Sequence, residues 1–293
     1  MVKGIITKGI AGFYYVKVED KVFECKARGK FRNSNITPVV GDIVKIIPEE
    51  SNLTGSIVEI LPRKNILTRP SVANVDQAII VFAAKNPDPN LQLLDRFLVL
   101  VEEQNLEICI CINKIDIDKE KTYQEIKNTY EKIGYKVILT SAILNIGIDK
   151  LKNELFNKVT TFAGPSGVGK SSLLNAIDSS LSLKTGEISK KVKRGKHTTR
   201  HVELLNLKEE SFVLDTPGFS MLSLEHINPK ELKNLFKEFL PYNDLCRFSQ
   251  CSHIHEPDCI IKQKVEEGVI DAGRYKRYQM FYKELETSKQ RRW

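Results

Sequence analysis

The sequence has no long apolar segment. No run approaches the roughly 18 residues that a membrane-spanning helix requires, although hydrophobic residues make up 41% of the chain. The N-terminal stretch MVKGIITKGIAGFYYVKVEDK lacks both the apolar core and the small-residue cleavage site of a signal peptide. We therefore expect a cytoplasmic protein that has no membrane partner.

The sequence also lacks an acidic excess, internal repeats and low-complexity tracts. Its 45 basic and 37 acidic side chains give a net charge of +8. Such a balance favours a polyanionic partner, although a merely lysine-rich composition accounts for the charge equally well. The 293 residues are enough for two or three domains.

Cysteine is scarce, with six residues in the chain. Cys25, Cys109 and Cys111 lie in apolar, strand-like contexts and are expected to be buried thiols. The other three cysteines cluster near the C-terminus. In a reducing compartment such a cluster indicates a metal site rather than disulfides.

Short β-type runs dominate the first part of the chain. Residues 1–64 contain runs rich in β-branched and aromatic residues, separated by Gly, Pro, Asn or Asp. This pattern predicts an all-β domain of about five strands. An oligonucleotide-binding (OB) barrel is the best candidate, and a barrel of SH3 type is the alternative. Residues 61–71, LPRKNILTRPS, are expected to form a linker.

The rest of the chain predicts two further domains. Residues 65–220 alternate between buried strands and amphipathic helices, which predicts a doubly wound α/β domain. Residues 221–293 are expected to form a helical domain around a metal site. The helices expected in these two domains cover residues 93–105, 122–135, 148–157, 170–177, 228–242 and 262–288.

The string GPSGVGKS, residues 164–171, matches the G-x-x-x-x-G-K-[ST] pattern of a phosphate-binding loop. Its glycines let backbone N–H groups face phosphate oxygens, and the following helix directs its positive end at the same anion. Lys170 is expected to reach the β- and γ-phosphates, and the Ser171 hydroxyl to bind Mg²⁺. A predicted strand precedes the string and a predicted helix follows it, as the motif requires.

The string DTPG, residues 215–218, follows another predicted strand. Asp215 therefore lies at the carboxyl end of a strand, where open α/β sheets bind ligands. We expect this carboxylate to orient Mg²⁺ through water, and the Gly218 N–H to sense the γ-phosphate. Any strand-to-turn junction can carry Asp and Gly, but the pairing of DTPG with a phosphate-binding loop indicates a nucleotide-hydrolysing site.

The string NKID, residues 113–116, predicts recognition of guanine. The Asp116 carboxylate can accept hydrogen bonds from guanine N1–H and N2–H₂, which adenine does not offer in that arrangement. Asn113 is expected to tie loops together, and the stem of Lys114 to lie along the base. The string TSA, residues 140–142, ends the next strand and resembles the loop whose backbone N–H meets guanine O6.

These motifs define the expected ligand-binding residues. The expected GTP-binding residues are Asn113, Lys114, Ile115, Asp116, Ser141, Ala142, Gly164, Pro165, Ser166, Gly167, Val168, Gly169, Lys170, Ser171, Ser172, Thr198, Thr199, Asp215 and Gly218. The expected Mg²⁺ ligands are Ser171, Thr199 and Asp215, where either Thr198 or Thr199 is the switch threonine.

The base-reading strings precede the phosphate-binding loop, whereas a GTPase usually has the opposite order. This order is that of a circularly permuted GTPase core. Together with the barrel and the C-terminal Cys/His cluster, it resembles the ribosome small-subunit-dependent GTPase A family over essentially the whole chain. The resemblance implies hydrolysis of GTP to GDP, stimulated by the small (30S) ribosomal subunit, a role in late maturation of that subunit, and contact with 16S rRNA. We expect a monomer.

The stretch CRFSQCSHIHEPDC, residues 246–259, holds the clustered cysteines. Three thiolates and one imidazole make a closed tetrahedral site, which is typical of structural Zn²⁺. Both His253 and His255 are available as the fourth ligand. The family resemblance favours His253, and the implied zinc ligands are Cys246, Cys251, His253 and Cys259.

The group that acts on the attacking water belongs to none of these motifs. Phe219 follows DTPG where many GTPases have a glutamine that positions water, so intrinsic hydrolysis should be slow. His197 is the local candidate because an imidazole can orient or deprotonate water near neutral pH, and the family resemblance supports it. The alternative is an exposed histidine in the basic loop of residues 184–200.

Basic stretches at residues 21–32, 184–200 and 274–293 indicate contacts with RNA phosphates. Tyr275, Tyr278 and Tyr282 follow helical spacing, and we expect them to pack against the metal domain rather than stack on bases. An alternative function is a nucleotide-gated RNA-binding module whose hydrolysis is incidental. A further hypothesis is that hydrolysis repositions the C-terminal domain through the junction after DTPG.

Overall fold

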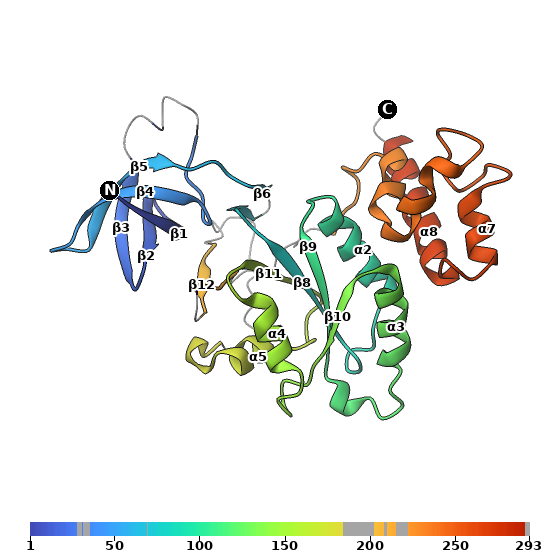
Figure 1. The fold of residues 1–293 in the computed structure, drawn as a ribbon, viewed down its shortest axis with the longest axis horizontal. Coiled ribbons are helices and arrows are strands. Elements are labelled where there is room, and N and C mark those ends of the chain that lie inside the picture. Colours follow the sequence, from blue (N-terminus) through green and yellow to red (C-terminus); the bar gives the residue numbers. More distant parts are fainter. Residues whose placement is uncertain are drawn as a thin grey trace.

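The structure is a computed structural model of the chain. It describes residues 1–27, 31, 36–68, 70–183, 202–207, 210–214 and 222–290. Three regions follow one another along the chain: a barrel, a sheet with helices on both faces, and a helical region (Figure 1). Five predicted site residues lie outside the described residues, namely His197, Thr198, Thr199, Asp215 and Gly218.

The N-terminal region is a closed barrel with the strand order β1-β2-β3-β5-β4. Strands β3 and β5 are parallel, and the other neighbours are antiparallel. This is the five-stranded arrangement of an OB barrel, which confirms the predicted class. The strands are β1 (Val2–Ile10), β2 (Phe13–Val18), β3 (Lys21–Ala27), β4 (Ile43–Glu49) and β5 (Thr54–Ile60).

The segment predicted to be a linker is structured, and that prediction is wrong. Strands β6 (Ile66–Thr68) and β7 (Ser71–Ala73) form an antiparallel pair. Just before them, Arg63 Nε and Nη2 donate to the two carboxylate oxygens of Asp42 at 2.7 and 2.8 Å. Because Asp42 is fully buried, this ion pair fixes the end of the barrel to the chain that leaves it.

The central sheet has the order β10-β9-β8-β11-β13-β12. All neighbouring pairs are parallel except β12 with β13, an antiparallel edge that the sequence did not predict. Helices α2 and α3 pack on one face and α4 and α5 on the other, which confirms the doubly wound domain (Figure 1). The strands are β8 (Gln77–Ala83), β9 (Glu107–Asn113), β10 (Lys136–Leu139), β11 (Val159–Ala163), β12 (Leu204–Asn206) and β13 (Phe212–Leu214). The helices are α2 (Leu91–Glu102), η1 (Ile115–Ile117), α3 (Tyr123–Ile133), α4 (Ile148–Leu155), α5 (Lys170–Ile177) and η2 (Ser179–Leu181).

The C-terminal region is helical, as predicted, but its helices are divided differently. The expected helix over residues 228–242 consists of two 3-10 segments, η3 (Pro229–Leu235) and η4 (Lys237–Leu245), and Pro241 inside the second lacks an N–H to donate. The expected helix over residues 262–288 is broken into α7 (Ile260–Glu266) and α8 (Ala272–Gln290). Between them, Asp271 Oδ1 accepts the Arg274 N–H at 2.7 Å and begins the second helix.

Helix α2 joins the central and C-terminal regions. Its Leu94 and Phe97 pack toward the sheet, whereas Val99 and Leu100 belong to the core of the C-terminal region. The fully buried Asp95 accepts hydrogen bonds from Tyr130 at 2.5 Å, from Arg274 at 2.6 Å and from Arg277. The C-terminal region is therefore docked on α2 by both apolar packing and a buried charge cluster.

Within the described ranges, no helix combines the length and the apolar character needed to cross a bilayer.

Candidate functional site

The phosphate-binding loop follows a completely buried strand. Strand β11 ends at Ala163, the loop turns through residues 164–169, and α5 begins at Lys170. Within the part of the chain that the structure describes, no side chain caps the start of α5, so its first N–H groups remain available to an anion. Gly169 has a φ of +97°, and a Cβ there would lie 2.4 Å from Asn113 Nδ2. Only glycine allows this close approach to the base-reading strand.

Lys170 is folded back over the phosphate-binding loop. Its Nζ donates to the carbonyl oxygens of Gly164 at 2.8 Å and Pro165 at 2.7 Å. Burial lowers the pKa of Lys170 to about 8, so the side chain is still mainly protonated at neutral pH. Among the described residues, the hydrogen bonds of this buried cation go to carbonyl groups, and it is well suited to exchange them for phosphate oxygens.

Asn113 connects the three predicted loops. Its Nδ2 donates to the carbonyl of Val168 in the phosphate-binding loop at 2.9 Å. Its Oδ1 accepts from Thr140 Oγ1 at 3.1 Å and from the Ala142 N–H at 3.3 Å, both in the TSA string. Since Asn113 is 1% exposed, these bonds hold the ends of β9, β10 and β11 in one fixed arrangement.

Lys114 and Asp116 follow Asn113 and differ in their surroundings. Lys114 adopts the left-handed conformation with a φ of +61°, and its Nζ donates to the carbonyls of Asn86 and of Gly167, the latter at 2.6 Å. Its stem therefore extends from the NKID string to the phosphate-binding loop. Asp116 is half-buried in η1, and its carboxylate makes no hydrogen bond to a described residue. That carboxylate is free to accept donors from a ligand.

The other predicted residues of the site occupy the same edge. Ser141 is fully buried, whereas Ser166 and Gly167 are exposed at the tip of the phosphate-binding loop. Ser171 is 6% exposed in the first turn of α5, followed by the half-buried Ser172. Strand β13 ends at Leu214, directly before the DTPG string. All four motifs thus leave the carboxyl ends of parallel strands, as expected for a ligand site in an open α/β sheet.

The Cys/His cluster lies in the C-terminal region. The ligand atoms of Cys246, Cys251, His253 and Cys259 all lie within 4.8 Å of one another. Cys246 Sγ lies 4.0 Å from Cys259 Sγ, and His253 Nδ1 lies 3.6 and 3.4 Å from these two sulfurs. With Zn–S near 2.3 Å and Zn–N near 2.0 Å, a tetrahedral site places its sulfurs about 3.8 Å apart and its sulfur and nitrogen about 3.5 Å apart. The donor set therefore fits a tetrahedral metal ion.

His253 is prepared as a ligand. Its Nε2 lies 3.1 Å from Asn243 Oδ1, which leaves Nδ1 to face the cysteine sulfurs. Burial lowers the pKa of His253 to about 4, so the imidazole is neutral at neutral pH. His255 is exposed and is not part of the cluster. Asn243 was not predicted from the sequence, because a single asparagine before the first cysteine carries no spacing signal.

The tyrosines of α8 pack against residues 246–259, the loop that carries the Cys/His cluster and is called the metal loop below. This contact confirms the packing prediction. Tyr275 Oη donates to the His253 carbonyl at 2.7 Å, and Tyr278 Oη donates to the Ser252 carbonyl at 2.5 Å. Tyr282 packs against the same core. These side chains fix the backbone of the metal loop rather than offering free rings to RNA bases.

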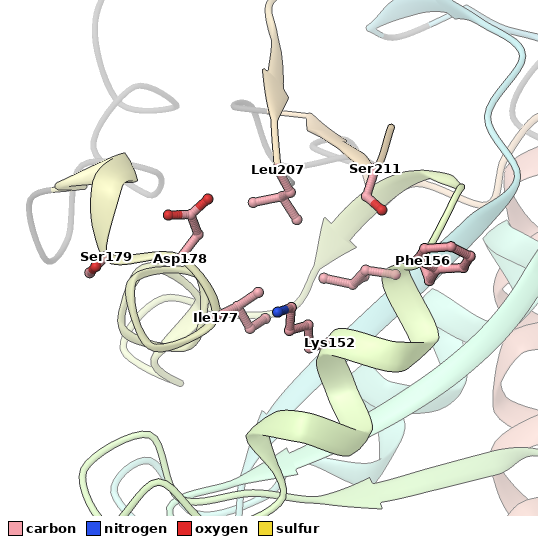
Figure 2. A pocket seen from close by; sticks show the side chains of 8 residues that line it. Lys152, Phe156, Ile177, Asp178, Ser179, Leu207 and Ser211 are labelled. Carbon is pink, nitrogen blue, oxygen red and sulfur yellow. The ribbon is translucent and has the colours of Figure 1, made fainter. Parts of the chain in front are cut away.

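A separate pocket lies at the far end of α5. It opens between the last turns of α4 and α5 and the residues that flank the β12–β13 turn (Figure 2). Lys152, Phe156 and Ile177 form part of its lining. Among the described residues, none of those predicted for the site lines this pocket. The pocket is distinct from the phosphate-binding loop, which lies where α5 begins.

Comparisons with known proteins agree with this geometry. Two family models match the chain: the RsgA N-terminal domain over residues 3–57 and the RsgA GTPase over residues 60–225. A small ribosomal subunit biogenesis GTPase RsgA from Caldanaerobacter subterraneus is 50% identical, and the match covers 100% of this chain and 98% of that protein. A protein of the same name from Alkaliphilus metalliredigens is 49% identical, with 99% of each chain covered.

Solved structures agree as well. The crystal structure of YjeQ from Thermotoga maritima matches with a TM-score of 0.85 at 40% identity, covering 97% of this chain and 98% of that chain. YloQ, described as a circularly permuted GTPase, matches with a TM-score of 0.84 at 41% identity, covering 98% and 96%. The motif order, the sheet and the comparisons lead to one conclusion: the chain belongs to the RsgA GTPase family.

Proposed function

We propose that this chain is a cytoplasmic, monomeric GTP hydrolase that binds the small (30S) ribosomal subunit, contacts its 16S rRNA and acts in its late maturation. The hydrogen bonds of the Asn113 side chain are the observation that supports the nucleotide site most directly. This buried side chain of the NKID string contacts both the phosphate-binding loop and the TSA string. The names of the relatives support the ribosomal role.

The proposed nucleotide site uses each motif for one part of GTP. The residues of the 164–172 segment bind the phosphates through backbone N–H groups and Lys170. Asp116 binds guanine N1–H and N2–H₂. In the loop of Ser141 and Ala142, the Ala142 N–H would exchange its 3.3 Å bond to Asn113 Oδ1 for guanine O6. The Lys114 stem and Ile115 lie beside the base, and Asn113 orients these loops.

The proposed Mg²⁺ ligands are oxygen donors, as this ion prefers. Ser171 supports the proposal because its hydroxyl lies at the start of α5 and makes no hydrogen bond to a described residue. Thr199, or Thr198 in its place, and Asp215 would complete the set. Bound Mg²⁺ would offset the charge that develops on the phosphate oxygens. His197 is proposed to orient the attacking water, and Gly218 to contact the γ-phosphate.

The proposed metal of the C-terminal region is Zn²⁺, held by Cys246, Cys251, His253 and Cys259. Four protein ligands leave no open position for a catalytic water, so the role is structural. The sulfur and nitrogen distances of a tetrahedral site support this choice.

Phosphate release measured with and without purified small subunits tests the function. We expect slow turnover by the chain alone and a large increase with small subunits, but not with large subunits. The competing function, a nucleotide-gated RNA-binding module, predicts subunit binding that depends on the nucleotide and turnover that the subunit does not change. That second result would overturn the proposal.

A further inference from the structure

A row of hydrogen bonds leads from the surface of the C-terminal region to the buried His253. It begins on η3, where the exposed Asn234 donates from Nδ2 to Oε2 of the exposed Glu231 at 2.9 Å. The half-buried Asn243 of η4 donates from Nδ2 to Asn234 Oδ1 at 3.1 Å. Asn243 Oδ1 in turn lies 3.1 Å from His253 Nε2. We call Glu231, Asn234 and Asn243 the Glu231 relay, because they join an exposed carboxylate to a proposed metal ligand.

The charge of Glu231 gives this relay one direction. An ionised carboxylate offers only acceptors, so the N–H₂ group of Asn234 must face it. The Asn234 oxygen then faces Asn243 and accepts its N–H₂ group, which leaves the Asn243 oxygen for His253. Since a carbonyl oxygen can only accept, this last bond requires the proton of the neutral imidazole to be on Nε2. The lone pair is then on Nδ1, the atom that lies 3.6 and 3.4 Å from two cysteine sulfurs.

Other contacts of His253 fix its place but not its proton. Phe239 meets the imidazole in a T-shaped arrangement, with the ring centroids 5.9 Å apart and an angle of 88° between the planes. Tyr275 Oη donates to the His253 carbonyl at 2.7 Å. Neither contact distinguishes one ring nitrogen from the other. Among the described residues, the side chain that bonds Nε2 is Asn243.

We propose that Asn243 is a positioning residue for the metal of the C-terminal region, and that Glu231 sets its direction through Asn234. The inference rests on the proposed Zn²⁺ site and adds three residues that lie outside the 246–259 stretch. With its proton on Nδ1, the same imidazole would direct an N–H group, rather than a lone pair, at the cysteine sulfurs. Partners behind a metal-binding histidine change metal affinity by about 10- to 100-fold. A carboxylate on the surface thus controls how tightly a buried site holds its metal.

Competition of the full chain with a zinc chelator tests the role of Asn243. Asn243→Leu has a similar size but no acceptor, and it should weaken Zn²⁺ binding by about 10- to 100-fold. Asn243→Asp keeps an oxygen that faces Nε2, so its affinity should stay within about threefold of the unchanged chain. The absorption spectrum of bound Co²⁺ should show three sulfurs and one nitrogen in every variant, because the ligands are unchanged. Unchanged Zn²⁺ affinity in Asn243→Leu would overturn the inference.

Nuclear magnetic resonance of ¹⁵N-labelled histidines gives a second measurement, which needs no variant. In the Zn²⁺-loaded chain, His253 should carry its proton on Nε2 and bind the metal through Nδ1. A proton on Nδ1 would overturn the inference, whatever the variants do. A chain that took up no metal at all would instead show that the proposed metal site itself fails.

Two variants of Glu231 test the direction of the relay. Glu231→Gln still offers an oxygen to Asn234, whereas Glu231→Lys offers only donors and favours the reverse order of bonds. Zn²⁺ should therefore bind Glu231→Lys at least about threefold more weakly than Glu231→Gln. Asp244→Lys and Asp244→Asn are the matched control, since they make the same change of charge at an exposed residue beside Asn243. These two should bind Zn²⁺ equally, and equal affinities of the two Glu231 variants would overturn the role of Glu231.

Discussion

At the scale of single residues, Asp116 is the group that should decide which base the site accepts. Its carboxylate offers two acceptors and has no described partner. Guanine offers two donors, at N1 and at the exocyclic N2, whereas xanthine offers a donor at N1 and an acceptor at O2. An asparagine supplies one acceptor and one donor, which matches xanthine.

Asp116→Asn should therefore exchange the preferred nucleotide. We expect the affinity for GDP to fall by about 100-fold, since a buried donor of the base is left unpaired, and the affinity for xanthosine diphosphate to rise. Competition binding with both nucleotides measures this exchange. Equal loss of both nucleotides would show that Asp116 maintains the loop rather than reading the base.

Gly169 makes a second prediction at this scale. Alanine at this position would place its Cβ 2.4 Å from Asn113 Nδ2, in a backbone conformation with a φ of +97°. Gly169→Ala should weaken GDP binding by at least about tenfold, because the Asn113 contact to the loop must shift. Gly12→Ala is the control: its φ is +84°, but a Cβ there would meet nothing within 4 Å. Gly12→Ala is expected to lower the free energy of unfolding by about 1 kcal/mol and to leave the GDP affinity unchanged.

Residues with fixed spacing could be predicted from the sequence, and their partners could not. The phosphate-binding string and NKID define their own positions, and the structure brings Asn113, Ala142 and Val168 into contact. Asn243, which contacts His253, and Asn86, whose carbonyl accepts from Lys114, belong to no motif. These pairs are far apart in the sequence or lack a fixed spacing, and they meet only in the folded chain.

At the scale of elements, the buried charge cluster around Asp95 of α2 should stabilise the packing of the C-terminal region on the central region. Asp95 is fully buried and faces Arg274, which is fully buried as well. Arg274 also pairs with Glu238 at 2.7 Å. Removing one partner of such a cluster leaves a buried charge without compensation, which is far more costly than losing a surface pair.

Asp95→Asn should accordingly lower the free energy of unfolding by about 3–5 kcal/mol. Glu50→Gln is the control, because the Lys21–Glu50 pair is exposed on both sides, and its loss should cost less than about 1 kcal/mol. Denaturant titration of both variants measures the difference. Equal costs would show that the cluster contributes no more than a surface pair does.

Metal removal is the second prediction for elements. The metal loop is attached to α8 through Tyr275 and Tyr278, so loss of the metal should loosen the loop and the helix together. We expect a chelator, or Cys259→Ser, to increase hydrogen exchange in residues 246–262 and in α8 and to lower the melting temperature. GDP affinity should change by less than about threefold, since none of the proposed nucleotide residues lies in this region. Unchanged exchange after verified metal loss would contradict a structural metal.

Elements with a strong hydrophobic period were predicted well, and those fixed by local or tertiary contacts were not. Helices α2 to α5 lie close to the predicted ranges because their apolar positions recur at helical spacing. The short β6–β7 pair and the edge strand β12 have three residues each, too few to show a period. The break between α7 and α8 depends on the Asp271 cap, which resembles any other acidic residue of a polar helix in sequence.

At the scale of the whole molecule, the permuted order leaves the site intact because the strand ends, rather than the order of the chain, define it. Parallel strands β9, β10 and β11 bring NKID, TSA and the phosphate-binding loop to one edge, and the parallel strand β13 ends at Leu214, just before DTPG in the chain. The C-terminal region follows the DTPG string in the chain but packs on α2. Repositioning of this region by hydrolysis stays a prediction, and it would have to move or break the α2 contacts as well.

Hydrolysis of xanthosine triphosphate by Asp116→Asn, with and without small subunits, tests the central claim most directly. The account predicts that small subunits stimulate this variant with the xanthine nucleotide and not with GTP, while the unchanged chain shows the reverse preference. This exchange of preference would show that one site recognises the base, hydrolyses the nucleotide and is stimulated by the small subunit. Subunit-stimulated GTP hydrolysis by Asp116→Asn at the rate of the unchanged chain would contradict the account.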